Sequence, residues 1–332
     1  MATTLEYARL MTRGGLIGTA LLVAMWGSGG GTTVWGQTPG LQPAGEQQPP
    51  AMVFKGGVDL VRIAAIVRDK KGRFVQDLSA RDFEILDNGL ARTISDFRSD
   101  VTGVSIALLF DVSGSMEGQL PHAREAARHV LSWLDSRDEA AVFTFDTRLD
   151  QRTPFTEGLK TLPSSVANVV PFGATSLHDA IALTAKRVGE REGRRRAVVV
   201  LTDADNASHL STAEAATAAS EIDVPVYIFG IVQDIDNPTS DLAVTSVERS
   251  AFAGPLPELA TATGGYTFVA STPSQRSLAA RQIIDELRHQ YLIAFESSGT
   301  PGWHPLVVRA HKKDLVVRAR NGYIAGQSRP SV

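Results

Sequence analysis

The sequence predicts an α/β protein with a doubly wound, mostly parallel sheet that is inserted in, or flanked by, a small β-sandwich module. Four strand-length segments in the middle of the chain are apolar at consecutive positions, which is typical of strands buried on both faces. Helical patterns alternate with these segments, as they do where helices cover both faces of a parallel sheet. The regions before and after predict short strands and turns instead. We therefore expect a second, all-β part.

Length and composition indicate a folded protein that does not bind nucleic acid. The chain has 332 residues, of which 43% are hydrophobic, enough for one large domain and a smaller one. Its formal net charge is −3, and its longest basic run, Arg194 to Arg196, directly precedes an apolar segment. A run this short favours a solvated entry to a strand over a phosphate-binding patch. Nucleic acid is therefore excluded as an expected partner.

Residues 1–36 predict a secretory signal peptide. Arg9 and Arg13 precede the apolar run Leu16–Trp26, and small residues follow it. The run is shorter than the roughly 20 residues that span a membrane. Cleavage before Gln37 is expected, with an uncleaved N-terminal membrane anchor as the alternative. The chain contains no cysteine, which excludes disulfides and a lipid-modified cysteine. We expect an exported protein, periplasmic or secreted, with no membrane span in its mature form.

The next segment predicts a linker followed by the first part of the β module. Residues 37–52 are rich in Gln, Pro and Gly and lack apolar periodicity, as flexible linkers do. Residues 53–100 form the N-terminal part of the module. Within them, Val58–Val67 predicts a strand, Asp69–Arg73 a hairpin turn and Phe83–Leu86 a further strand.

Residues 101–285 predict the α/β domain. Its four apolar strands are expected at 106–110, 141–145, 197–201 and 226–230. Helices are expected from Pro121 to Leu134, from Leu177 to Val188 and from Ser211 to Glu221. Ser211 and Glu214 have the spacing of a capping box at the start of the third helix. A last strand, 266–270, and a helix over about 274–289 complete the domain.

The pattern returns to β after that helix. Residues 286–325 predict the C-terminal part of the β module, and residues 326–332 a tail. Strands are expected at 290–295, 306–310 and 315–319. Neither flanking β segment is long enough to form a secure core alone. We therefore expect the two segments to pair into one small β-sandwich.

Oxygen-bearing side chains follow two of the central strands and lie in a loop between them. The strand that ends at Phe110 leads into Asp111–Met116, and the strand that ends at Leu201 leads into Thr202–Asp205. Gly173–Ser176 precedes a predicted helix. Ligands of open α/β sheets bind outside the carboxyl ends of the strands. Three loops therefore present hydroxyl and carboxylate oxygens at one edge of the sheet.

These residue types predict a site for a hard divalent cation. Hydroxyl and carboxylate oxygens without His or Cys suit a hard cation. A small number of protein ligands, with positions left for water, favours Mg²⁺ over an enclosed Ca²⁺ cage, with Mn²⁺ and Ca²⁺ as substitutes. Ser113 and Ser115 are two residues apart, so both hydroxyls can point to one side. Gly114 is expected to let the backbone turn closely between them, and Asp111 to supply charge beneath them.

Three motifs in this order carry a specific resemblance. The Asp-x-Ser-x-Ser at 111–115, the Gly-x-Thr at 173–175 and the Thr-Asp at 202–203 resemble the metal-ion-dependent adhesion site of von Willebrand factor A domains. The resemblance implies three direct ligands to the ion: Ser113, Ser115 and Thr175. It also implies two carboxylates that bind the ion directly or through water: Asp111 and Asp203.

The flanking segments extend the resemblance. Leu259–Tyr266 is similar to the late helix and strand of that family. Asp69–Gly72 with Phe83-Glu84, and Arg318–Tyr323, resemble a secreted bacterial subgroup of von Willebrand factor A proteins. Together these segments cover most of residues 55–325.

The resemblance implies metal-dependent protein binding, in which an acidic side chain of the partner completes the coordination of the ion. The expected partner is a protein or peptide that presents Asp or Glu. One alternative is a structural or assembly component in which the metal only stabilises the fold; a less favoured one is a metal-dependent hydrolase. His122 and His178 lie on predicted helices, and Ser113 lacks a Gly-x-Ser-x-Gly setting. We therefore expect no enzymatic activity.

Overall fold

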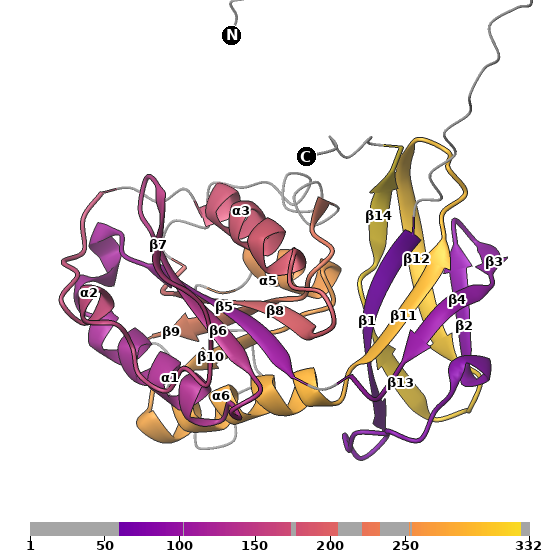
Figure 1. Cartoon of the computed structure of the whole chain (residues 1–332), viewed down its shortest axis with the longest axis horizontal. Coiled ribbons are helices and arrows are strands. Elements are labelled where there is room, and N and C mark those ends of the chain that lie inside the picture. Colours follow the sequence, from indigo (N-terminus) through magenta and orange to yellow (C-terminus); the bar gives the residue numbers. More distant parts are fainter. Residues whose placement is uncertain are drawn as a thin grey trace, which may run out of the picture. The chain divides into compact units, whose positions relative to one another are not determined.

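The computed structural model describes residues 60–101, 103–173, 177–204, 221–232, 252 and 254–326. All of them belong to one unit of the chain, Gly56–Val332. They form an α/β domain around a six-stranded sheet and a β module of two four-stranded sheets (Figure 1). The expected signal peptide, the linker, residues 211–220 of an expected helix and residues 327–332 of the tail lie outside the described residues. Among the described residues, no helix combines the length and the apolar character that crossing a membrane requires.

The central sheet of the α/β domain has the strand order β10-β9-β8-β5-β6-β7. All neighbouring strands are parallel except β7, which runs antiparallel to β6. Every residue of the central strand β5 is buried, as its unbroken apolar sequence predicts. The strands are β5 (Val104–Asp111), β6 (Glu139–Phe145), β7 (Leu149–Glu157), β8 (Arg195–Thr202), β9 (Val226–Ile231) and β10 (Thr267–Ala270).

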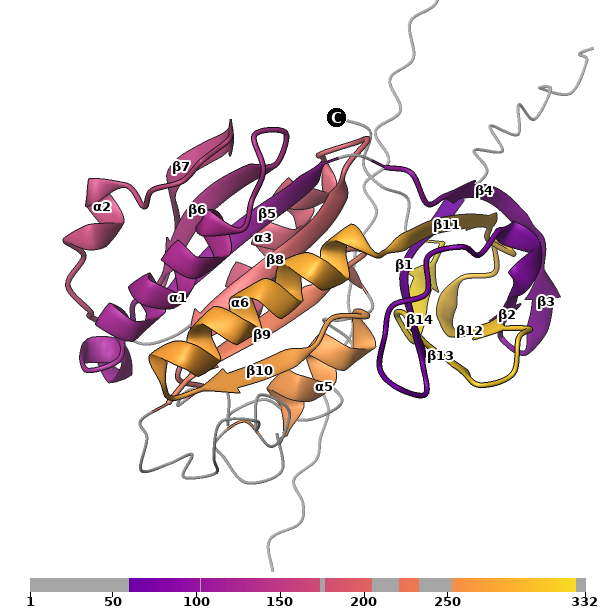
Figure 2. The same ribbon diagram turned by 90° about the horizontal axis from the view of Figure 1, so that it is seen from below.

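Helices cover both faces of this sheet, so the predicted fold class is confirmed. One face packs against α1 and α6, and the other packs against α3 and α5 (Figure 2). The buried residues of α1 recur at three- and four-residue spacing, which is the apolar stripe of an amphipathic helix. The helices are α1 (Leu120–Ser132), the short α2 (Ser164–Ala167), α3 (Leu177–Gly189), α5 (Pro255–Ala262) and α6 (Pro273–Arg288).

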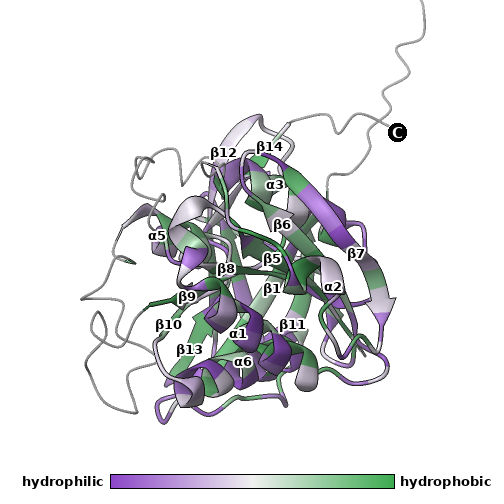
Figure 3. Cartoon of the chain, turned by 90° about the vertical axis from the view of Figure 1, so that its left-hand side faces the viewer, coloured by the Kyte–Doolittle hydropathy of each residue, from purple (hydrophilic) through white to green (hydrophobic). Residues whose placement is uncertain are grey.

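Strand β7 was not among the expected elements. It lies at an edge of the sheet, and none of its residues is buried, so its sequence lacks an apolar run. Pro154 is tolerated in it because an edge strand leaves one row of backbone groups unpaired. Figure 3 shows the contrast between hydrophilic colours along β7 and hydrophobic colours along β5 and β8. The sheet is therefore mixed at this edge.

In the β module, strands from before and after the α/β domain pair with one another. Strand β1 pairs antiparallel with both β11 and β13, and β2 pairs antiparallel with β12. The sheet orders are β13-β1-β11-β4 and β14-β12-β2-β3. The strands are β1 (Leu60–Asp69), β2 (Phe83–Asp87), β3 (Leu90–Arg92), β4 (Ile94–Arg98), β11 (Tyr291–Glu296), β12 (Gly302–Ala310), β13 (Leu315–Arg318) and β14 (Gly322–Ala325). One apolar core, which includes Ile63, Phe83 and Phe295, lies between the sheets.

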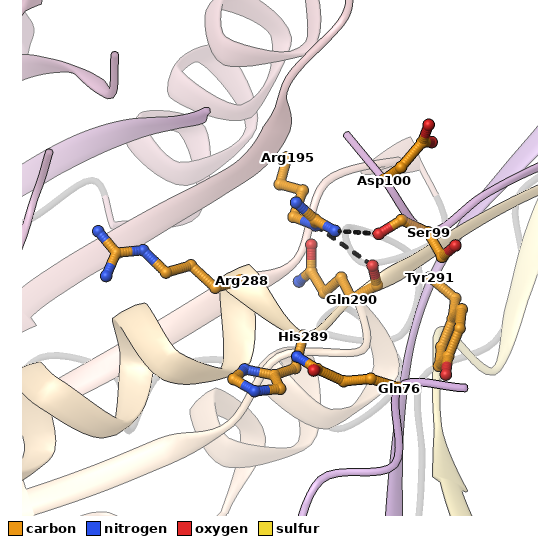
Figure 4. Close-up of a pocket in the computed structure, with 8 residues that line it drawn as sticks. All are labelled: Gln76, Ser99, Asp100, Arg195, Arg288, His289, Gln290 and Tyr291. Atoms are coloured by element: carbon orange, nitrogen blue, oxygen red, sulfur yellow. Dashed lines mark hydrogen bonds between the residues drawn. The ribbon is translucent and has the colours of Figure 1, made fainter. Parts of the chain in front are cut away.

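Arg195, at the start of β8, donates hydrogen bonds to both segments that connect the α/β domain with the β module (Figure 4). Its guanidinium donates to the carbonyl oxygens of Ser99 (2.8 Å) and Val101, which lie between β4 and β5. It also donates to the carbonyl oxygen of Gln290 (3.2 Å), between α6 and β11. A pocket of about 200 Å³ lies beside these groups. Burial of Arg195 lowers the pKa of its guanidinium.

Replacing Arg195 with Met is expected to lower the free energy of unfolding by about 2 kcal/mol, because three carbonyl oxygens lose a charged donor. Urea unfolding followed by circular dichroism measures this change. Arg309→Met, at an exposed position of β12, is the matched control and should change stability by less than about 0.5 kcal/mol. Equal stabilities of the two variants would contradict the role assigned to Arg195.

Candidate metal centre

The pairing of β5 with β8 brings two of the predicted loops together. The strands are parallel neighbours, and Phe110 lies opposite Leu201, so Asp111 and Thr202 end the two strands side by side. After Asp111 the chain enters a short 3-10 helix, Gly114–Glu117, which leads to α1. The two loops therefore open at the carboxyl edge of the sheet, as the sequence predicts.

The carboxylate of Asp111 is held on both oxygens. The backbone N–H of Ser113 donates to Oδ1 at 3.0 Å, and the hydroxyl of Thr202 donates to Oδ2 at 2.7 Å. Thr202 Oγ1 in turn accepts from the backbone N–H of Ala204 at 3.0 Å. Asp111 is only 2% exposed. Its orientation is therefore set by buried groups of both strand ends.

The hydroxyls of two serines connect the loop that follows Asp111 to the second acidic residue, Asp203. Ser113 Oγ lies 3.1 Å from Ser115 Oγ, and the hydroxyl of Ser115 donates to Asp203 Oδ1 at 3.3 Å. Asp111, Ser113, Ser115 and Asp203 are thus brought together, as the sequence predicts. Thr175, the fifth predicted residue, lies outside the described residues.

A positive φ is required at Gly173 and not at Gly114. Among the described residues, a methyl group at position 114 would meet the carbonyl oxygen of Gly173 at 3.9 Å, which is an ordinary contact. The described residues therefore give no steric reason for glycine at position 114. Gly173 has a φ of 86°, a left-handed conformation that favours glycine. Its carbonyl oxygen accepts from the N–H of Gly114 at 3.3 Å and ties the third loop to the first.

The electrostatics of the site favour a bound cation. Burial raises the pKa of the Asp111 carboxyl, and the negative charge of Asp203 raises it further. Among the described residues, no three His, Cys, Asp or Glu side chains are grouped so that they could hold a metal. A cation here would therefore need hydroxyl ligands as well. Two carboxylates together with two serine hydroxyls are a donor set that fits a hard divalent ion.

Thr202 belongs to the Thr-Asp motif at 202–203, but its type and spacing alone predict no role for it. Thr202 is fully buried and holds one oxygen of Asp111. The next residue but one, Ala204, has a φ of 60°, which is uncommon for a residue with a side chain. Backbone strain of this kind is often found at functional sites. The position of Thr202 at the last residue of a buried strand was the available signal.

Replacing Thr202 with Val is expected to weaken Mg²⁺ binding about 10- to 100-fold, the usual effect of removing a group that orients a ligand. Thr202→Ser retains the hydroxyl and should restore most of the affinity. Calorimetric titration of Mg²⁺ into both variants measures the difference. If Val and Ser at this position bound Mg²⁺ equally, Thr202 would not orient Asp111 for the metal.

One family model and several solved structures are similar to part of this chain. Residues 106–206 match the family model of the von Willebrand factor type A domain. The solved structure of BatB from Bacteroides thetaiotaomicron has 20% identity and a TM-score of 0.43, over 56% of this chain and 98% of that chain. A von Willebrand factor type A protein from Catenulispora acidiphila has 12% identity and a TM-score of 0.44, over 83% and 76% of the two chains.

A third solved structure is proximal thread matrix protein 1 from the mussel byssus, whose metal-ion-dependent adhesion site motif holds zinc. It has 19% identity and a TM-score of 0.40, over 61% of this chain and 50% of that chain. No curated protein matches the sequence. The family match runs from β5 to just beyond β8 and includes Asp111 and Asp203. The matched part of the α/β domain is therefore similar to a von Willebrand factor type A domain.

Proposed function

We propose that this chain is an exported protein that binds a partner protein or peptide through a divalent cation. The proposed ligands of the cation are Asp111, Ser113, Ser115, Thr175 and Asp203. Mg²⁺ is the first choice, and Mn²⁺ and Ca²⁺ are substitutes. The observation that carries the proposal is the series of hydrogen bonds that joins Asp111 to the backbone N–H of Ser113, the Ser113 hydroxyl to that of Ser115, and the Ser115 hydroxyl to Asp203.

Each of these hydrogen-bonded groups has a distinct role in the proposed site. Thr202 and the N–H of Ser113 hold the Asp111 carboxylate, while the hydroxyls of Ser113 and Ser115 offer lone pairs. When bound, the cation supplies an electrophilic position that a carboxylate of the partner can occupy. Partner binding should then depend on the metal and require an accessible Asp or Glu.

Support for protein binding also comes from the family, because von Willebrand factor type A domains commonly take part in protein interactions. Two alternatives make different predictions. A metal that only stabilises the fold would raise the melting temperature without creating a carboxylate site. A metal-dependent hydrolase would turn over ester or phosphoester substrates. We propose that the chain has no such activity.

Acetate is a minimal probe of the proposed site. We expect acetate to shift the backbone amide resonances of Ser113–Glu117 when Mg²⁺ is present, and not when the metal is removed by EDTA. Thr175→Ala should abolish the acetate effect while leaving the melting temperature of the metal-free chain unchanged. A rise in melting temperature with Mg²⁺, without acetate binding, would favour the purely structural role. Equal acetate binding in EDTA would refute metal-dependent recognition.

Export is a separate part of the proposal and rests on residues 1–36. Expression in a bacterial host followed by N-terminal sequencing of the exported protein should give Gln37 as the first residue. An exported chain that retains its first residues would instead support the uncleaved anchor.

A further inference from the structure

We infer that two exposed apolar residues beside the candidate metal centre form a second contact for the partner. Val170 and Phe172, named here the apolar rim, would select a carboxylate that has an apolar group next to it. This inference rests on the proposed function, because the metal-bound carboxylate places the partner against the rim. The predicted partner segment therefore contains Asp or Glu beside an aliphatic or aromatic residue.

The apolar rim is unusually exposed. Val170 is 78% exposed and Phe172 is 80% exposed, the highest values among the exposed large hydrophobic residues of the described part of the chain. The same segment also has an inward side, since Val166 is buried and Val169 packs against the core. Exposure of Val170 and Phe172 is therefore specific to these side chains. Aromatic residues presented in this way are enriched at protein interfaces.

Hydrogen bonds attach the rim to the candidate metal centre. The backbone N–H of Phe172 donates to the carbonyl oxygen of Val112 at 2.9 Å, and Val112 lies between Asp111 and Ser113. At the next position, the carbonyl oxygen of Gly173 accepts from Gly114. Phe172 is therefore bonded through its backbone to the loop that carries the proposed ligands. A group bound at the metal and a group bound at the rim must belong to neighbouring parts of one ligand.

The segment that carries the rim is held in place. Pro171 fixes its own φ and restricts Val170 to an extended conformation. Arg124 of α1 donates to the carbonyl oxygens of Val166 (3.0 Å) and Val169 (2.9 Å). A contact surface that is ordered before binding loses little conformational entropy on binding. The rim can therefore contribute to affinity more fully than a flexible loop.

The chemistry of the rim determines what can bind beside the carboxylate. Positions 169–173 contain two valines, proline, phenylalanine and glycine, so this stretch offers no side-chain charge or hydrogen-bond donor. A polar or charged neighbour in the partner would lose hydration against these five residues and gain no hydrogen bond from their side chains. An apolar neighbour would gain from burial. Because Phe172 is bonded to the loop of the metal site, this neighbour should lie about one or two residues from the acidic one.

A pair of carboxylate probes tests this inference on the full chain. Acetate and phenylpropionate are titrated separately into the Mg²⁺-saturated chain and followed by the amide resonances of Ser113–Glu117. We expect phenylpropionate to bind roughly tenfold more tightly than acetate, because its ring covers apolar surface. In Phe172→Ser the two affinities should become nearly equal, while Mg²⁺ and acetate bind as in the wild type. Leu90→Ser, which replaces a 65% exposed residue of β3, is the matched control and should keep the preference.

The outcomes separate this inference from the proposed function. If Mg²⁺ and acetate bind but phenylpropionate binds no better, or if Phe172→Ser keeps the preference, the rim is not a partner contact. A phenylpropionate preference that persists in EDTA would also overturn the inference, because the rim would act without the metal. Self-association that is lost in Phe172→Ser would assign the rim to a second copy of the chain and overturn the proposed partner. If neither Mg²⁺ nor acetate binds, the proposed function itself fails, and the inference with it.

Discussion

Replacing Asp87 with Ala is expected to lower the free energy of unfolding by about 3–5 kcal/mol, the usual cost of breaking a buried ion pair. Asp87 is fully buried in the β module. Its carboxylate accepts from Arg92 at 2.9 Å, from Tyr323 at 3.2 Å and from His304 at 2.8 Å. The other ring nitrogen of His304 lies 2.8 Å from the carbonyl oxygen of Thr300. Both ring nitrogens of His304 therefore face oxygen atoms of buried or partly buried groups.

Without Asp87, the guanidinium of Arg92 and the ring of His304 would share a poorly solvated site with no carboxylate. Urea unfolding at neutral pH measures the loss of stability. Asp96→Ala is a matched control, because Asp96 lies in β4 with 46% of its side chain exposed and pairs with a similarly exposed Arg98. The control should change stability by less than about 0.5 kcal/mol. A loss for Asp87→Ala no greater than that of the control would show that this network does not stabilise the module.

Asp111→Asn is expected to weaken Mg²⁺ binding by more than about 100-fold and yet to stabilise the metal-free chain at neutral pH. Burial raises the pKa of Asp111 above its ordinary value of 3.8, so the folded chain holds this proton more tightly than the unfolded chain. Stability is then highest when the carboxyl is protonated and falls as the pH rises from about 3.8 through the higher folded value. Asparagine keeps the shape of the side chain without the buried charge.

Melting curves in EDTA between about pH 3.5 and pH 8 test this sign. We expect Asp111→Asn to melt above the wild type at neutral pH, with the difference shrinking toward acid. Saturating Mg²⁺ should reverse the order, because only the wild type gains stability from the ion. Asp150→Asn, at a position with 54% of its side chain exposed, is the control for loss of an acidic charge. A melting temperature of Asp111→Asn below that of the wild type at neutral pH in EDTA would contradict this electrostatic interpretation.

The main features of the fold were predictable because buried strands consist mostly of apolar residues. Strands such as β5 and β8 are buried along nearly their whole length and are therefore apolar at consecutive positions. Strand β7 has no such apolar run, since its position at the edge of the sheet permits polar residues on both faces. β12 begins at Gly302 and not at Leu306, because the pairing of Trp303 and His304 with β14 is a long-range contact.

The proximity of four of the predicted site residues was predictable, because chain position determines where the ends of parallel strands meet. Asp111 and Asp203 follow adjacent buried strands, and no side-chain geometry is needed to place them at one edge. The role of Thr202 was not predictable, because it depends on a single hydrogen bond across two strands. The same holds for the exposure of Phe172, which depends on how its loop is anchored to Val112.

Calorimetric titration of Mg²⁺ into the EDTA-treated and dialysed chain tests the proposed metal site most directly. We expect saturable binding of about one ion per chain in the wild type, and none in Asp111→Ala or Ser113→Ala. Ser132→Ala, at the exposed end of α1, is the matched control and should bind as the wild type does. Absence of saturable binding in the wild type, or binding that survives in Asp111→Ala, would contradict the metal site proposed for this domain.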